Sequence, residues 1–447
     1  MANNSKIWKG NWTFILAAAG SAVGLGNIWK FPYMAGENGG GAFVIIYLAC
    51  IILIGFPVMM SEIFLGKYGR SSPVYTMKKF VSLKGISSYW VLLGWFGALA
   101  GLMILSYYSV FAGISLAYIF SPIPADSLNP SQYSVDFFAQ FQSSPMRMIF
   151  WHSLFLILTC FIVAKGVVDG IGATIKIIMP TLFFLIILLS IYSSFTGEIG
   201  KAISFLFMPD FSKISSSVII SAMGQAFFTL SLGMGAIMAY GAYIPEEQNL
   251  TKTVSLIIFL DTFVAIIAGV IIFPIVFANP ELTPTAGPSL FFETLPVAFY
   301  GIPFSFFASA LFFILVSLAA LSSSVSLIEP STAWMEDRFK ISRTYAVTIL
   351  GSIAWLLGLG SLFSFNLIAD FQIFSMSFLD FMDFLTNSIM LPLGGLFIAL
   401  LVGWILSENF VKEEMKIKNE LYWKIWINLT RYVAPILIGL VFIFALF

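Results

Sequence analysis

The chain has 447 residues, of which 59% are hydrophobic and only 10% charged, and its formal net charge is zero. Its mean hydropathy of +0.97 is too high for a soluble enzyme of this length, so the composition indicates an integral membrane protein in a lipid bilayer. The single histidine, His152, and two cysteines in apolar runs argue against imidazole catalysis, zinc sites and disulfides. No basic block recurs outside the loops, so we expect no nucleic-acid partner. One histidine and two separated cysteines supply little for a catalytic site, so we also expect no enzymatic activity.

Eleven apolar runs, separated by charged or turn-rich breaks, are long enough to cross a bilayer as helices. We therefore expect an all-α integral membrane protein that forms a single transmembrane domain over residues 1–447. The predicted spans are 12–33, 41–65, 88–120, 147–164, 170–193, 216–243, 252–277, 302–335, 344–361, 373–405 and 424–446.

The orientation of the chain follows from lysine and arginine. These residues gather after the second span, between Lys67 and Lys84, and are absent from the preceding loop, 35–40. Positive loops lie on the cytoplasmic side, so we expect the N-terminus inside and the C-terminus outside. The apolar run from Trp12 lacks a small-residue cleavage site, so it is expected to remain as the first span. The outer segment 278–296, rich in proline and glycine, predicts either a hairpin-like lid or a passive loop.

The first span contains a stretch, Gly20–Phe31, in which a continuous helix is not expected. It holds three glycines, a serine, an asparagine and a lysine. Backbone groups freed by a break have no water in the bilayer, so protein, a cavity or a ligand must satisfy them. Carbonyls at a break can hold a cation, and helix-end N–H groups can hold a carboxylate. The spacing Gly20-x-x-x-Gly24 is also typical of simple helix packing.

A second interrupted span lies at Gln225–Gly235, where polar residues and closely spaced glycines return. It comes five spans after the first. The chain therefore divides into two five-helix repeats, 12–193 and 216–405, with 424–446 as an additional eleventh helix. Paired interruptions at corresponding positions of inverted repeats are typical of a transporter binding site.

Five motifs extend this interpretation to a family. They are NIWKFPY at 27–33, GENGGGAF at 36–43, GQAFFTLS at 224–231, AALSSS at 319–324 and LDFMD at 379–383. Together they closely resemble the neurotransmitter:sodium symporters, and the missing twelfth span resembles the bacterial eleven-span amino-acid branch with its leucine-transporter-like fold. The resemblance implies sodium-coupled symport of a neutral amino acid by alternating access. It also implies a multi-pass protein of a bacterial-type inner (plasma) membrane.

The resemblance implies two sodium ions, each held by oxygen ligands. The first site would use the Ala22 carbonyl and the side chains of Asn27, Thr229 and Asp261, with the substrate carboxylate. The second site would use the carbonyls of Gly20, Val23 and Ala319 and the hydroxyls of Ser322 and Ser323. Sodium is a hard cation, and broken membrane helices supply such oxygens.

The resemblance also implies a substrate pocket shared by four spans. Tyr108 would donate to the substrate carboxylate, although a tyrosine in an apolar span is also typical of an ordinary core residue. The implied pocket residues are Ser21, Ala22, Leu25, Gly26, Ile104, Tyr108, Phe228, Thr229, Ser231, Met234, Ser323 and Leu327.

Two positions bear on the substrate and ion classes. Monoamine carriers of the family place an aspartate where this chain has Gly24, so the glycine favours a substrate that brings its own carboxylate. Chloride-dependent relatives carry a serine where this chain has Ala265. Asp261, a costly carboxylate inside a span, would supply that negative charge itself, so we expect no chloride requirement. A buried structural carboxylate is the alternative.

Gates are implied on both sides of the pocket. Outside, Lys30 would form a water-mediated pair with Asp383, although relatives usually have arginine here and lysine lacks its planar fork. Inside, Trp8 and Asp337 match the family's cytoplasmic gate, and Lys6 stands beside the position of the usual arginine.

The fifth and sixth spans carry two further hints. Gly170 and Pro180 fit a motif that lets the fifth span unwind, although an ordinary proline kink is the alternative. Met234, between two glycines, predicts an adaptable apolar wall for large hydrophobic or aromatic amino acids of the tyrosine, tryptophan or leucine type.

Two other functions remain open at this point. A sodium-conducting channel would use the same oxygen-rich breaks, and a transporter-like amino-acid sensor would use the same pocket. The sequence leaves the oligomeric state open.

Overall fold

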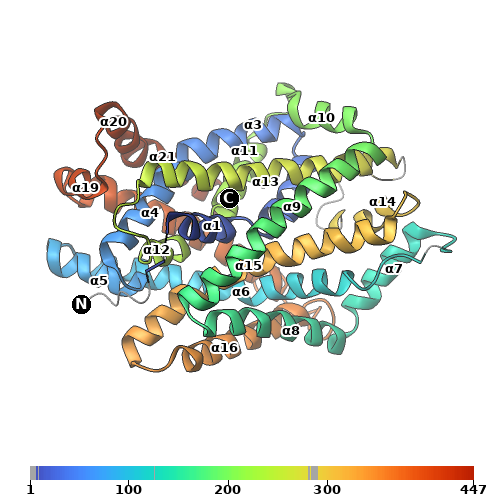
Figure 1. Ribbon diagram of the computed structural model, residues 1–447, viewed down its shortest axis with the longest axis horizontal. Helices are drawn as coiled ribbons and strands as arrows, with labels where there is room; N and C mark the ends of the chain where they lie inside the picture. The colour runs from blue at the N-terminus through green and yellow to red at the C-terminus, as the bar shows by residue number, and fades with distance from the viewer. Residues whose placement is uncertain (1–6, 9, 125, 280–281, 283–289, 447) are drawn as a thin grey trace.

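The computed structural model describes residues 7–8, 10–124, 126–279, 282 and 290–446 (Figure 1). Within these residues every regular secondary-structure element is a helix, and one isolated β-bridge pairs Ile373 with Met376. The all-α prediction is therefore confirmed.

The first predicted repeat begins with a broken helix and continues with four long ones. Its elements are α1 (Asn11–Ala22), η2 (Gly26–Lys30), α2 (Phe31–Glu37), α3 (Gly41–Cys50), η3 (Ile51–Gly55), α4 (Phe56–Gly69), α6 (Val91–Tyr118), α8 (Pro145–Ala164), η5 (Val167–Gly172) and α9 (Ala173–Thr196).

The second predicted repeat follows the same order, and one more helix closes the chain. These elements are α11 (Ser216–Thr229), α12 (Ala236–Gly241), α13 (Leu250–Ala278), α15 (Ser305–Phe339), α16 (Arg343–Phe363), α17 (Phe378–Asp383), η8 (Phe384–Met390), α18 (Leu391–Leu400), η9 (Leu401–Ile405), α20 (Glu420–Asn428), η10 (Leu429–Val433) and α21 (Ala434–Leu446).

Short helices that the sequence analysis did not predict lie in the connections. They are α5 (Pro73–Lys84), η4 (Ser88–Trp90), α7 (Pro130–Gln142), α10 (Ile199–Phe207), η6 (Phe211–Lys213), η7 (Leu290–Thr294), α14 (Leu295–Phe299) and α19 (Glu408–Met415). Residues 280–281 and 283–289 of the predicted lid at 278–296 lie outside the described residues, and its described C-terminal part, 290–296, is helical.

The number of spans was predicted as eleven. Among the described residues, nine helices are long and apolar enough to cross a membrane, and α1 with η2–α2 makes a tenth that is bent by 50°. The eleventh crossing depends on taking α11 and α12 as one interrupted span across residues 230–235, so that exact number stays a prediction. Several helices exceed their predicted limits by up to four residues, as α15 does at its C-terminal end, because they continue beyond the apolar run.

The broken helices lie in the middle of the bundle. Figure 1 shows α1 between α13 and α15, which both pack against it, and α12 packs on α4. The long helices α6 and α15 pack along each other. They approach closely because Gly101 has no side chain: a Cβ atom there would lie 2.5 Å from the Leu327 carbonyl oxygen. Small residues are the usual means of close helix packing in membranes.

Candidate functional site

The first predicted break is present. Helix α1 ends at Ala22, Val23 is extended (φ −71°, ψ 107°), and helical structure resumes at Gly26. Side chains satisfy two of the freed N–H groups: Gly24 N donates to Asn27 Oδ1 (3.0 Å), and Leu25 N donates to Tyr108 Oη (3.2 Å).

The second predicted break is also present, between Thr229 at the end of α11 and Ala236 at the start of α12. Ser231, Gly233 and Gly235 have positive φ angles of 54°, 78° and 72°. Two of these conformations fall on glycine, which adopts them without steric cost.

Side chains of the second broken helix satisfy backbone carbonyls of the first. Gln225 Nε2 donates to the Gly26 carbonyl (2.6 Å), and Ser231 Oγ donates to the Ser21 carbonyl (2.9 Å). Backbone released from one helix is therefore paired by side chains of the other, as a water-free environment requires.

A small cavity, with room for about 10 Å³ of water-sized probe centres, lies where the breaks meet. Ser21 and Thr229, two of the predicted pocket residues, do not line it; Ser21 Oγ donates to Ser326 Oγ (2.7 Å) and Thr229 Oγ1 donates to Asp261 Oδ1 (3.0 Å). The lining residues are Ala22, Gly24, Leu25, Gly26, Ile104, Tyr108, Phe228, Ser231, Met234, Ser323 and Leu327.

Position 24 has no room for a larger side chain. A Cβ atom on Gly24 would lie 2.8 Å from Tyr108 Oη and 2.9 Å from Ser323 Cβ. Both distances are below ordinary van der Waals contact, so the neighbours would have to move. An aspartate at this position is incompatible with the observed packing.

Asp261 is fully buried and lies beside the cavity. Its Oδ1 accepts from Asn27 Nδ2 (2.7 Å) and Thr229 Oγ1 (3.0 Å), and its Oδ2 accepts from Tyr47 Oη (3.5 Å). Three of the residues implied for the first sodium site are thus in direct contact. Tyr47 was not among the predicted residues. This oxygen-rich group has the chemistry to hold a hard cation.

The residues implied for the second sodium site gather where α15 crosses α1. Ser322 Oγ contacts the carbonyls of Ala319 (2.9 Å) and Val23 (3.3 Å). Ser323 Oγ donates to the Ser21 carbonyl (3.1 Å). Gly20 faces this group, because a Cβ atom there would lie 3.4 Å from Ser322 Cβ. Only hydroxyl and carbonyl oxygens are offered, which again suits a hard cation.

The implied outer gate is held by other contacts. Lys30 Nζ lies 4.6 Å from the centroid of the Phe228 ring, a cation–π contact. Asp383 Oδ1 accepts from Asn387 Nδ2 (2.5 Å). In the described part of the chain no direct ion pair joins Lys30 to Asp383, and a water-mediated pair stays a prediction.

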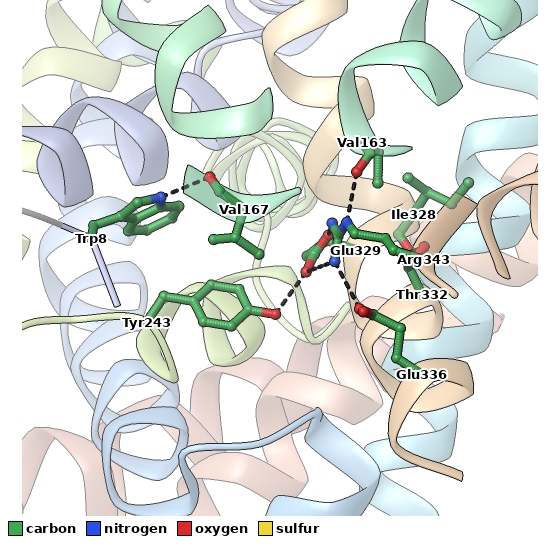
Figure 2. Close-up of polar contacts among 9 residues, drawn as sticks. All are labelled: Trp8, Val163, Val167, Tyr243, Ile328, Glu329, Thr332, Glu336 and Arg343. Carbon is green, nitrogen blue, oxygen red and sulfur yellow. Dashed lines mark hydrogen bonds and ion pairs between the residues drawn. The ribbon is translucent and has the colours of Figure 1, made fainter. Parts of the chain in front are cut away.

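The implied inner gate is closed around Trp8, which is 2% exposed. Its Nε1 donates to the Val167 carbonyl (3.0 Å; Figure 2), and its backbone N–H donates to the Tyr243 carbonyl (3.2 Å). Asp337 Oδ2 accepts from Ser72 N (3.4 Å). Lys6, the predicted substitute for the gate arginine, lies outside the described residues.

The predicted unwinding motif falls on the fifth span. Gly170 lies in η5, a π-helical turn (Val167–Gly172) that precedes α9, and Pro180 lies inside α9. Since π-turns and prolines are common causes of local helix distortion, this end of the span departs from regular α-helix already in the closed form.

The sequence analysis missed two buried acidic residues, Glu62 and Glu329, which are both fully buried. Glu62 Oε1 accepts from the Gly233 N–H (2.6 Å) in the second break, and Glu329 pairs with Arg343. Their position in apolar spans could have identified them, because burying an ionisable side chain in a membrane costs free energy and such residues are usually functional.

Comparison with known proteins agrees with a transporter built around two broken helices. The model of the sodium:neurotransmitter symporter family matches residues 5–130 and 142–447. A sodium-dependent transporter of Haemophilus influenzae is 34% identical over 100% of both chains. The sodium-dependent transporter YhdH of Bacillus subtilis is 33% identical over 98% of this chain and 96% of its own length. The crystal structure of MhsT in complex with L-phenylalanine has a TM-score of 0.89 and 42% sequence identity, covering 98% of this chain and 99% of MhsT.

The paired breaks and these matches define a sodium-dependent, multi-pass membrane transporter. The chain belongs to the sodium:neurotransmitter symporter family, as its motifs predicted, and it is a transporter rather than an enzyme.

The contact between Glu62 and Gly233 generates a stability prediction. Glu62→Ala leaves a buried N–H without its acceptor, which costs about 1–3 kcal/mol, so the midpoint of thermal unfolding in detergent should fall by several degrees. Glu62→Gln keeps an acceptor oxygen and should lower the midpoint of thermal unfolding by less. Equal losses in the two variants would show that this hydrogen bond is not what stabilises the second break.

Proposed function

We propose that the protein is a symporter that couples the inward movement of sodium to that of a neutral amino acid by alternating access. The observation that carries the proposal is the cavity between two broken helices, with two groups of oxygen atoms beside it. Such breaks are where transporters of this architecture bind substrate and coupling ions. The proposed setting is a bacterial-type inner membrane, with the N-terminus cytoplasmic and the C-terminus outside.

The proposed substrate is a hydrophobic or aromatic amino acid. The cavity lining includes Tyr108 and the first break, which suit a carboxylate, and Ile104, Met234 and Leu327, which suit an apolar side chain. MhsT was crystallised with L-phenylalanine and shares 42% of its sequence with this chain. The absence of a side chain at Gly24 further favours a substrate that carries its own carboxylate.

Two sodium ions and no chloride are proposed. The first ion would be held by the Ala22 carbonyl and by Asn27, Thr229 and Asp261, and the second by the carbonyls and hydroxyls around Ser322. Asp261 brings a carboxylate to the first group. A buried charge needs a partner of opposite sign, so a sodium ion bound there would need no additional anion.

Uptake into proteoliposomes tests the whole proposal. We expect accumulation of phenylalanine, tyrosine, tryptophan or leucine against a gradient when sodium is high outside, with chloride replaced by gluconate. Amino-acid binding without accumulation under any ion gradient would instead indicate a sensor. Sodium flux that does not saturate and is independent of amino acid would indicate a channel.

The ion proposal generates a prediction about charge. Asp261→Asn removes the carboxylate, so the apparent sodium affinity should fall by about tenfold or more, equivalent to at least 1.4 kcal/mol. Transport in gluconate should fall with it. Asp370→Asn, which changes an exposed aspartate, is the matched control and should transport normally. Normal sodium dependence of Asp261→Asn with and without chloride would contradict the proposed role.

The pocket generates a prediction about size. Met234 is 2% exposed and lines the cavity. In Met234→Phe a rigid ring replaces a flexible thioether, so kcat/KM should fall by about tenfold or more for tryptophan and tyrosine, the range expected of an apolar pocket that no longer fits. The kcat/KM for leucine, which is smaller, should fall less. Competition of the three amino acids in one uptake assay measures the difference, and equal effects would argue against Met234 as the wall.

A further inference from the structure

A groove with a volume of about 480 Å³ opens on the outer surface of the bundle, between the start of α6 and the middle of α18. Both helices belong to membrane spans, and Tyr89 at the rim is 79% exposed. The medium beside this groove is therefore lipid rather than water. The residues that line it include Ser87, Tyr89, Trp90, Phe96, Leu393 and Phe397.

The groove runs from one membrane interface into one leaflet. Tyr89 and Trp90 mark the interface, because tyrosine and tryptophan concentrate at the level of the lipid headgroups. Trp90 packs edge-on against Phe397, with the ring centroids 6.3 Å apart. Phe96 lies six residues beyond Trp90, which is about 9 Å deeper at 1.5 Å per residue. Since a hydrocarbon core is about 30 Å thick, the groove follows a lipid tail within a single leaflet.

Lysines gather at the headgroup end of the groove. Helix α5 packs against both η4 and α6 (Figure 1), and it contains Lys78, Lys79 and Lys84 but no acidic residue. Lys84 comes three residues before Ser87, and its Nζ lies 3.4 Å from the centroid of the Phe410 ring. Phe410 belongs to α19, which follows the span that contains α18. This contact therefore joins the two segments that continue from the groove walls, and it places a cation at their end.

The three lysines are held by aromatic rings and not by carboxylates. Lys78 Nζ lies 4.8 Å from the centroid of the Tyr75 ring, and Lys79 Nζ lies 4.9 Å from that of Tyr68. Among the residues that the structure describes, none of the three forms an ion pair. A cation–π contact orients an ammonium group but brings no negative charge to it. The headgroup end of the groove therefore attracts an anion.

Neutral donors stand at the same end. Ser87 Oγ accepts from Tyr89 N (3.4 Å), and its hydroxyl can still donate. The indole N–H of Trp90 is a donor only. Donors beside a cation suit a phosphate group. A zwitterionic headgroup would bring its own positive charge toward Lys84, so an anionic headgroup is favoured.

We propose that the groove between α6 and α18 binds one anionic membrane phospholipid, with an acyl chain along Phe96 and Leu393 and the phosphate at Lys84 and Ser87. The apolar walls give the same van der Waals contact to the chain of any phospholipid, so the discrimination comes from charge. One lysine near the membrane surface favours an anionic lipid by about fivefold. The proposal concerns lipid binding alone and does not depend on the transport function proposed above.

Quenching of tryptophan fluorescence by brominated phospholipids tests the site in the intact protein. Wild type and Trp90→Phe are reconstituted into phosphatidylcholine vesicles that contain increasing fractions of brominated phosphatidylglycerol or brominated phosphatidylcholine. The difference between the two proteins reports Trp90, which lines the groove. We expect half of the Trp90 quenching at an about fivefold lower mole fraction of the brominated phosphatidylglycerol.

Charge variants test the headgroup end. Lys84→Gln, measured against its own Trp90→Phe partner, keeps a polar side chain but removes the charge, so the ratio of the two mole fractions should fall to about one. Lys252→Gln is the matched control, because it removes an exposed lysine from the first turn of α13, and the ratio should stay at about five. In about 1 M salt the wild-type ratio should also fall, since the Debye length is then about 3 Å.

Three results would overturn the proposal. Equal quenching of wild-type Trp90 by the two lipids would show that the groove holds whichever lipid surrounds the protein. A preference that survives in Lys84→Gln would show that this lysine does not hold the headgroup. A Trp90 signal that neither lipid quenches would show that the groove is covered by protein, such as a second copy of the chain.

Discussion

The absence of water in the bilayer is the constraint on which the rest of this structure depends. A helix that breaks at mid-membrane must find partners for its N–H and C=O groups within the protein. Here the second broken helix supplies donors to the first: Gln225 reaches the Gly26 carbonyl, and Ser231 reaches the Ser21 carbonyl. The two breaks therefore form one unit with a common cavity, and any displacement of one half must be transmitted to the other. This is the physical basis on which ions and substrate bound at that cavity can be coupled.

The two sides of the cavity are closed by interactions of different strength. On the outside, Lys30 lies over the Phe228 ring and is still partly exposed. On the inside, the fully buried Trp8 is packed edge-on against Tyr240 and Tyr243, with ring centroids 5.2 and 5.7 Å away. A partly exposed cation–π contact contributes about 0.5–1 kcal/mol, and the inner closure combines several contacts of that order. The closure around Trp8 therefore combines more contacts than the closure at Lys30.

Features that depend on local residue type, such as the helix breaks, could be predicted from the sequence. Contacts between residues far apart in the chain could not. Both breaks were predicted correctly, because glycines and polar residues inside apolar runs have a direct local meaning. The pairing of Glu62 with Gly233 was missed, since the two residues lie far apart in the chain and no local pattern connects them. The short amphipathic helices in the connections were missed because apolar run length, the signal used, does not detect them. For the same reason Tyr47 was not placed beside Asp261, although its ring is fully buried there.

The packing around Gly24 restricts how the specificity of this transporter could change in evolution. By resemblance, carriers of monoamines need an aspartate at this position. Tyr108 Oη lies at the end of a side chain that can rotate, but Ser323 Cβ is fixed to the backbone of α15, 2.9 Å from where the first side-chain atom would stand. A single substitution to aspartate would therefore meet the helix before it could meet a ligand. A lineage that moves from amino acids to amines has to shift α15 first, or in the same step, so this pair of positions is expected to change together rather than singly.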